Sequence, residues 1–213
     1  MKKGIGLLLV CLFTISVAVG CSVLDKINSL GDRTAAPTPI PGWEKFEGKG
    51  VEVWLPESFE GGDLENDVDV VVQNLRRLGS EYEQTAEMIE QNPDMFAIWV
   101  FDSEVGPSGA LTNLNVTSEK VLSAITLDTY LDAVSGQLPS AFAIVEREIV
   151  TLSGYEAGRL VIEVSAPVLV AKELMYAIKE GGTMWVIAYT TGADEFDERL
   201  PIFEQSAETF KIQ

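Results

Sequence analysis

Residues 142–191 read FAIVEREIVTLSGYEAGRLVIEVSAPVLVAKELMYAIKEGGTMWVIAYTT, and this stretch decides the fold. Apolar and β-branched residues run through four segments of it, and short pairs of residues separate the segments. Such runs are typical of strands, and the glycine-containing pairs Ser153-Gly154 and Gly181-Gly182 are typical of tight hairpin turns. We therefore predict four consecutive antiparallel strands, at Phe142 to Leu152, Tyr155 to Ala166, Val168 to Lys179 and Met184 to Thr191.

Helical periodicity lies on both sides of these strands. Apolar residues that recur at three- and four-residue steps predict one long amphipathic helix ending before Pro93, or two abutting helices divided at Gly79. Thr126 is expected to cap a shorter helix. A last apolar stripe from Phe196 to Phe210 predicts a closing helix with Pro201 in its first turn, where the missing N–H costs nothing.

Shorter strands are predicted nearer the amino terminus. Alternation of apolar and polar residues on both sides of Gly48-Lys49-Gly50 favours a hairpin, and two further apolar runs favour strands. The turn formers of residues 103–110 predict a mobile loop. Antiparallel strands with helices before and after them indicate an α+β fold, an antiparallel sheet sandwiched between helices. The predicted N-terminal strands are Trp43 to Phe46, Val51 to Leu55, Met95 to Phe101 and Leu111 to Val116.

Four local phrases carry a resemblance to a known family: Gly50 to Pro56, Leu111 to Val116, Leu152 to Leu160 and Phe203 to Phe210. They resemble the PsbP-like superfamily, whose α/β/α sandwich is shared with the Ran-binding Mog proteins and with bacterial lipoproteins. The resemblance covers nearly everything after residue 42 and implies a PsbP-like α/β/α sandwich. Known members support the water-oxidising site of photosynthesis as extrinsic subunits, and others are adaptors or binding proteins. Histidine-based metal positions of some relatives have no counterpart here, because the chain has no histidine.

The first residues predict export and lipidation. Lys2 and Lys3 precede an uncharged apolar run, as in a secretory signal. The end of this run, Ala18-Val19-Gly20-Cys21, resembles the lipobox of bacterial lipoproteins, in which cleavage before the cysteine exposes it to acylation. We predict a signal peptide over 1–20, an acylated Cys21 with a proline-rich tether over 21–42, and a PsbP-like α+β domain over 43–213.

Composition limits what the mature chain binds. Loss of Lys2 and Lys3 from the 15 basic residues leaves 13 against 33 acidic residues, a formal net charge of −20. Such a chain repels nucleic-acid phosphates and anionic headgroups, so we expect no nucleic-acid partner and membrane attachment only through acyl chains. Cleavage and acylation also remove both cysteines from disulfide, metal or nucleophilic chemistry.

The absence of histidine argues against an enzyme. Histidine is the usual general base near neutral pH and the middle member of serine and cysteine triads. A hydrolase built on two carboxylates stays open as an alternative, because the chain is rich in acidic residues. No cofactor is expected, although hard oxygen ligands keep Ca²⁺ as an alternative.

Binding residues are the remaining candidates. Asn113 and Asn115 would lie on one strand face and could contact a ligand, and Ser103 and Glu104 open the loop where a partner contact is expected. Acids near the first long helix are candidate metal ligands, although acids at a helix start also complement its dipole. These acids are Asp63, Glu65, Asp67 and Asp69.

Together these features predict a membrane-tethered lipoprotein of the bacterial cell envelope, facing the periplasm or the cell exterior. We interpret it as a non-catalytic binding or assembly module for an envelope protein complex. The alternatives are a lipoprotein that binds Ca²⁺ or a small ligand, and a carboxylate-based hydrolase.

Overall fold

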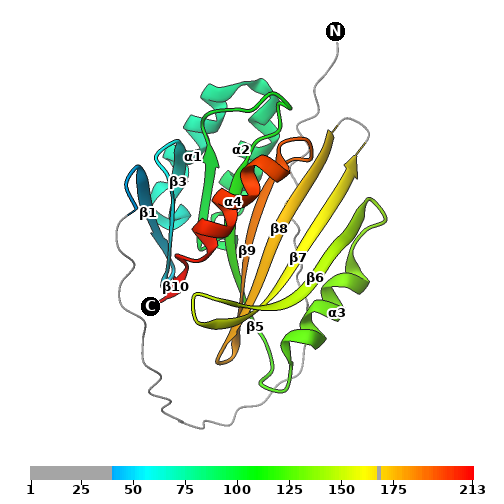
Figure 1. The fold of residues 1–213 in the computed structure, drawn as a ribbon. Coiled ribbons are helices and arrows are strands. Elements are labelled where there is room, and N and C mark those ends of the chain that lie inside the picture. Colours follow the sequence, from blue (N-terminus) through cyan, green and yellow to red (C-terminus); the bar gives the residue numbers. More distant parts are fainter. Residues whose placement is uncertain (1–39, 167–168) are drawn as a thin grey trace.

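A seven-stranded antiparallel sheet forms the centre of the molecule, with strand order β3-β4-β5-β9-β8-β7-β6 (Figure 1). The computed structural model describes residues 40–166 and 169–213. The four long strands predicted from residues 142–191 are confirmed as β6 to β9, with ends within about two residues of the prediction. The strands are β3 (Phe59–Gly62), β4 (Ile98–Asp102), β5 (Asn113–Lys120), β6 (Phe142–Leu152), β7 (Tyr155–Ala166), β8 (Leu169–Glu180) and β9 (Thr183–Gly192).

A smaller sheet has the order β1-β2-β10 and contains the predicted N-terminal hairpin. Its strands are β1 (Trp43–Gly48), β2 (Val51–Pro56) and β10 (Lys211–Ile212). Lys49 and Gly50 at the hairpin turn both have positive φ, 45° and 80°. Two central residues with positive φ suit the right-handed twist of the flanking strands. This hairpin is therefore confirmed, and the C-terminal strand β10 closes onto it.

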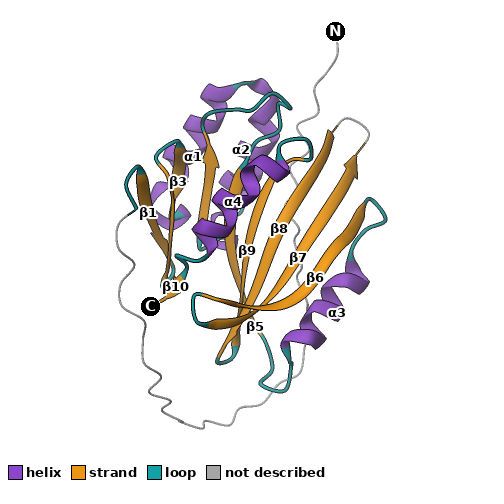
Figure 2. Cartoon of the chain, in the orientation of Figure 1, coloured by secondary structure: helices purple, strands orange, loops and turns teal. Residues whose placement is uncertain are grey.

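Helices flank the sheet on both sides (Figure 2). The long N-terminal helical stretch is two abutting helices, the second of the alternatives that the periodicity left open. Thr126 caps α3 as predicted, because its side chain accepts a hydrogen bond from the Thr129 N–H. The helical elements are α1 (Leu64–Leu78), η1 (Ser80–Tyr82), α2 (Glu83–Gln91), η2 (Pro93–Met95), α3 (Leu127–Gln137) and α4 (Phe196–Ala207).

Pro201 corrects one expectation. It lies inside α4, five residues after the helix begins at Phe196, and not in the first turn. A proline at this depth removes one i to i−4 hydrogen bond, to the carbonyl of Asp197. Apolar anchors hold the helix despite that loss, because Phe203 and Ala207 after the proline are fully buried.

The layers are those of an α/β/α sandwich. On one face, called here the α4 face, Phe203 and Phe210 pack with Val53 of the small sheet and with Tyr189 of the large one. Figure 1 shows α4 in front of the strands. The opposite face, called here the α3 face, carries two clusters. The first holds α3 against β7 and β8, and the second holds α1 and α2 against Trp99 and Phe101 of β4.

Close approach fixes α3 on the sheet at Gly158. A Cβ atom built on this glycine would lie 2.6 Å from Leu131 Cδ1. Leu131 is fully buried, so a side chain at position 158 would have to displace it within the core. Glycine at this point of β7 therefore sets the distance between α3 and the sheet.

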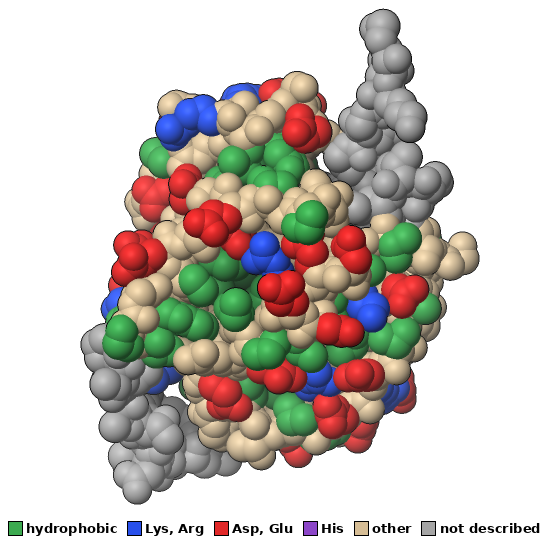
Figure 3. All heavy atoms as spheres, turned by 45° about the horizontal axis from the view of Figure 1, so that its top comes forward, with side chains coloured by type: hydrophobic (Ala, Val, Ile, Leu, Met, Phe, Trp, Pro, Cys, Tyr) green, Lys and Arg blue, Asp and Glu red, His purple; other side chains and the backbone are tan. Residues whose placement is uncertain are grey.

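Acidic side chains are spread over the face of the molecule seen in Figure 3, in keeping with a formal net charge of −18 for the whole chain. No helix in the described parts of the chain is long and apolar enough to cross a membrane. The predicted signal peptide, the acylation at Cys21 and most of the predicted tether lie outside the described residues.

Candidate functional site

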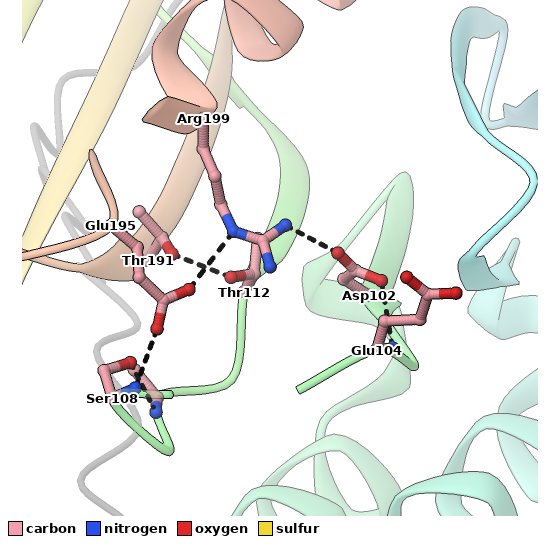
Figure 4. A network of polar contacts seen from close by, with 8 residues as sticks. Asp102, Glu104, Ser108, Thr112, Thr191, Glu195 and Arg199 are labelled. Atoms are coloured by element: carbon pink, nitrogen blue, oxygen red, sulfur yellow. Dashed lines mark hydrogen bonds and ion pairs between the residues drawn. The ribbon is translucent and has the colours of Figure 1, made fainter. Parts of the chain in front are cut away.

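An ion-pair network lies where β4 ends and α4 begins (Figure 4). Arg199 Nη1 donates to Asp102 Oδ2 at 2.6 Å, and Arg199 Nε donates to Glu195 Oε2 at 3.3 Å. Asp102 and Glu195 are only 4% and 7% exposed. Such buried carboxylates require a partner, because leaving a charge unpaired in a low-dielectric interior is costly. Arg199 therefore joins two elements that are 97 residues apart.

The same two carboxylates hold the loop that follows β4. Glu195 Oε1 accepts a hydrogen bond from the Ser108 N–H at 2.9 Å, and Asp102 Oδ1 accepts one from the Glu104 N–H at 3.0 Å. At the loop entrance, the N–H and Oγ of Ser103 both donate to the Ser58 carbonyl oxygen, at 2.9 and 2.8 Å. The composition of residues 103–110 predicted a mobile loop, but the structure attaches it at three points.

At Gly106, the middle of this loop lies in close contact with the Glu195 side chain. A Cβ atom at Gly106 would lie 2.0 Å from Glu195 Oε2, so the loop passes directly over the carboxylate and only glycine fits there. Glu104 and Val105 point outward, and Val105 is 40% exposed. The loop thus offers a small fixed surface with one acidic and one apolar side chain.

The electrostatics of Glu195 favour a permanent charge. Burial by itself would raise the pKa of this carboxyl, but hydrogen bonds from Ser108 and the nearby Arg199 guanidinium outweigh burial. The net result is a pKa below the ordinary glutamate value. A general acid at neutral pH needs a raised pKa, so Glu195 has the properties of a structural anion.

Two buried threonines complete the network. Thr112 at the end of the loop and Thr191 of β9 are 2% and 0% exposed, and their hydroxyl oxygens are 2.7 Å apart. This bond joins the far end of the loop to the central strands (Figure 4). The loop is consequently fixed at its entrance, its middle and its exit.

The predicted Asn113 and Asn115 lie on the α3 face of β5, since Leu114 and Val116 of the same strand belong to the core of the α4 face. Both asparagines are buried, at 7% and 6% exposed. Asn113 donates to the Leu111 carbonyl oxygen at 3.0 Å. Sequence reasoning placed the two on one strand face, and the structure adds that this face is covered.

Two residues that sequence reasoning missed extend this polar row across the sheet. Asn113 is the register partner of Thr190, and Thr190 is the register partner of Glu173. Thr190 Oγ1 donates to Glu173 Oε2 at 3.2 Å, and Glu173 is 1% exposed. The available signal was that Glu173 alternates with Met175 and Ala177, so that an acidic residue lies on the same strand face as buried apolar ones.

Trp99 adjoins the row and has an indole N–H without a hydrogen-bond partner among the described residues. The side chain is fully buried, and its register partner is Asn115. Buried hydrogen-bond donors nearly always have an acceptor, in the protein or in a bound molecule, so a buried donor without one requires an explanation. This donor marks the place on the α3 face where an acceptor atom would be stabilised.

The acids near the first helix have a structural use. Asp63 caps α1, because Oδ1 accepts from the Glu65 N–H at 3.0 Å and Oδ2 accepts from Asn66 Nδ2 at 2.8 Å. Glu65 and Asp67 lie in the first turn, where they complement the helix dipole, and Asp69 follows within the helix. Within residues 40–166 and 169–213, no group of three or more histidine, cysteine, aspartate or glutamate residues is arranged to hold a metal ion.

The comparisons with known proteins concern the fold. No family model matches the chain, and no curated protein does. CyanoP, the cyanobacterial PsbP of Synechocystis sp. PCC 6803, has a solution structure that aligns with a TM-score of 0.52 at 14% identity, over 86% of this chain and 99% of CyanoP. The PsbP-like α+β fold is thereby confirmed.

Two other similar structures align with TM-scores below 0.5. LpqN, described as involved in cell envelope biogenesis of Mycobacterium tuberculosis, aligns at 0.49 with 12% identity, over 80% of this chain and 91% of LpqN. PA94, a protein of unknown function and putative regulator from Pseudomonas aeruginosa, aligns at 0.42 with 17% identity, over 49% of this chain and 74% of PA94.

Proposed function

We propose that this protein is a non-catalytic binding module of the bacterial envelope. Its PsbP-like sandwich holds a surface loop in place by buried charges, which supports this role. Acyl chains on Cys21 hold it at the membrane, and the loop of residues 103–110 contacts an envelope protein. One observation carries the proposal: Arg199 pairs with Asp102 and Glu195, whose other oxygens hold the loop backbone at Glu104 and Ser108.

A fixed loop suits a binding role for a thermodynamic reason. Ordering a loop upon association costs free energy, on the order of 0.5–1.5 kcal/mol for each flexible side chain that is immobilised. Here the folded domain has already ordered the backbone. Glu104 and Val105 therefore meet a partner at a reduced entropic cost, with an apolar contact at the centre and an acidic group beside it.

A non-catalytic role agrees with the chemistry of the described residues. The chain has no histidine, and the buried Glu195 has a lowered pKa, which is opposite to what a general acid needs. Arg199 pairs with both buried carboxylates, Asp102 and Glu195, and the two carboxylates also hold the loop backbone. Within this network, every charged group is therefore engaged in supporting the loop.

Site-specific photo-crosslinking tests the proposal. A photoreactive amino acid replaces Val105 in the full-length acylated protein in its native cells, and a matched control carries it at Leu122, which is 50% exposed on another loop. We expect one crosslinked envelope protein from position 105 and none from position 122. The same crosslinks from both positions, or none from position 105, would contradict the proposal.

The unpaired indole N–H of Trp99 favours a second candidate function, the binding of a small polar ligand on the α3 face. Such a ligand would place an acceptor oxygen at hydrogen-bond distance from Trp99 Nε1. Thermal unfolding with a panel of small carboxylates and sugars tests it. A rise in the midpoint that the Trp99→Phe variant loses supports this candidate, and unchanged midpoints for the whole panel would dismiss it.

A further inference from the structure

The outer edge of β6 is an open strand edge. This strand of 11 residues lies at the end of the large sheet and, within residues 40–166 and 169–213, pairs only with β7 (Figure 1). In an antiparallel pair every second residue directs its N–H and C=O away from the neighbouring strand. β6 therefore presents a row of backbone donors and acceptors that another strand can bind.

The regular part of this edge runs from Glu146 to Leu152. A register shift between Ile144 and Glu146 interrupts the pairing with β7, and from Glu146 onward the pairing is continuous. A bulge protects the edge near Val145, because it twists the strand away from a potential neighbour. The open edge is thus about seven residues long, a usual strand length.

An acidic cavity accompanies this edge on the α4 face. It measures about 420 Å³ and contains Arg159, which donates to Glu146, Glu148 and Glu204 at 2.7, 2.9 and 3.1 Å. Arg159 is buried, with 9% of its side chain exposed, whereas these three glutamates are 58%, 54% and 47% exposed. The cavity is lined by Glu146, Glu148, Val150, Thr151, Leu152, Arg159, Tyr176, Glu204 and Glu208.

The charges of the cavity select its occupant. Four glutamates against one arginine leave a formal charge of −3. The single basic residue of β6, Arg147, belongs to the other face, where it pairs with Asp128 and Asp132 of α3. If two copies of the chain paired through β6, their glutamates would repel each other. A strand with lysine or arginine at alternate positions would find complementary charges instead.

We propose that β6 accepts an extended basic segment of a partner protein as an additional strand of the sheet. Backbone hydrogen bonds join the segment to residues 146–152, and its lysine or arginine side chains enter the cavity beside Glu146 and Glu148. The exposed Ile149, 44% accessible, offers an apolar contact on the other face. This inference goes beyond the proposed function and does not rest on the loop of residues 103–110.

The test uses the full acylated chain in mild detergent and a synthetic peptide, acetyl-Lys-Val-Lys-Val-Thr-Val-Thr-amide, with a fluorescent label. A second peptide has the same side chains, but every backbone nitrogen is methylated, so that neither of its edges can donate a hydrogen bond to a strand. A third has glutamate in place of lysine. We expect anisotropy to report binding of the first peptide only, weaker at high salt.

Variants of the protein distinguish binding at the β6 edge from non-specific attraction of a basic peptide to an acidic protein. Glu146→Gln with Glu148→Gln removes two charges from the cavity, and Glu44→Gln with Glu57→Gln removes two exposed charges elsewhere as a matched control. We expect at least tenfold weaker binding for the first pair of changes and less than twofold for the second.

Equal binding of the methylated peptide would overturn the proposal, and this result uses the unaltered protein, so it does not depend on the variants folding. Equal weakening by the two pairs of changes, binding of the glutamate peptide, or self-association of the chain through β6 would overturn it as well. None of these outcomes depends on whether a partner contacts the loop at Val105. The β6 proposal and the proposed function of the loop can therefore be refuted independently.

Discussion

Arg199→Met removes the cation that joins β4, α4 and the loop of residues 103–110. Two carboxylates, whose side chains are 5% and 8% exposed, would then lie buried without the cation that pairs with both. Removing one member of a buried ion pair costs about 3–5 kcal/mol. Because 18% of the Arg199 side chain is exposed, solvent relieves part of this cost, and we expect a loss of about 3 kcal/mol. For a domain of this size that corresponds to a midpoint about 6–12 °C lower.

Urea unfolding measures this loss, and hydrogen exchange at the Glu104 and Ser108 amides measures the order of the loop. Both amides donate to the two carboxylates, so we expect their exchange to accelerate in Arg199→Met. Adding Asp102→Asn and Glu195→Gln to the variant removes the unpaired charges and should recover part of the stability.

The matched control is Arg147→Met. Arg147 also bridges two carboxylates, but Asp128 and Asp132 are 74% and 70% exposed. Exposed ion pairs contribute about 0–1 kcal/mol, so this variant should lose little stability. The reasoning is refuted if both arginine variants lose the same amount, or if the loop amides of Arg199→Met exchange as slowly as in the wild type.

Other predictions concern pH, packing and the anchor. The lowered pKa of Glu195 contributes stability that is complete above the ordinary glutamate pKa and is lost as the pH falls through the lower folded-state value. The urea concentration at the unfolding midpoint should therefore decrease once the pH is below about 4.5. This decrease should be smaller in Glu195→Gln, which has no carboxyl to protonate at this position. Gly158→Val should lower the free energy of unfolding by about 1–3 kcal/mol, because a Cβ there meets Leu131. Gly136→Ala in α3, where a Cβ meets no atom within 4 Å, should raise it by about 0.5–1 kcal/mol. Thermal unfolding measures both, and equal effects would contradict the packing argument. Cys21→Ser should move the protein from the membrane fraction to the soluble fraction, and unchanged partitioning would reject lipidation.

Local sequence patterns were sufficient for most of the sheet. The strands β6 to β9 were predicted closely, because each is at least ten residues long and glycine pairs divide them in two places. The strands β3 and β10 were missed because they have four and two residues, too few for a period to be recognised. Pro201 was misplaced because tertiary burial, and not its own preference, decides where α4 begins.

The candidate site was harder to predict, because its contacts join distant parts of the chain. Asn113 and Asn115 could be found, since polar residues alternating along a strand are a local signal. Arg199 could not, because Asp102 lies 97 residues away. The loop of residues 103–110 has the composition of a mobile segment, and it is fixed by contacts with distant residues, such as that of Ser108 with Glu195, 87 residues away.

The most direct test of the central claim is quantitative co-purification from native membranes in mild detergent. The wild type, Val105→Asp and the control Leu122→Asp are compared, with mass spectrometry of everything that travels with each. We predict one envelope protein in a fixed ratio to the wild type and to Leu122→Asp, and its loss from Val105→Asp. A chain that migrates alone in all three forms, or a partner retained by Val105→Asp, would contradict the claim that this loop is the binding surface.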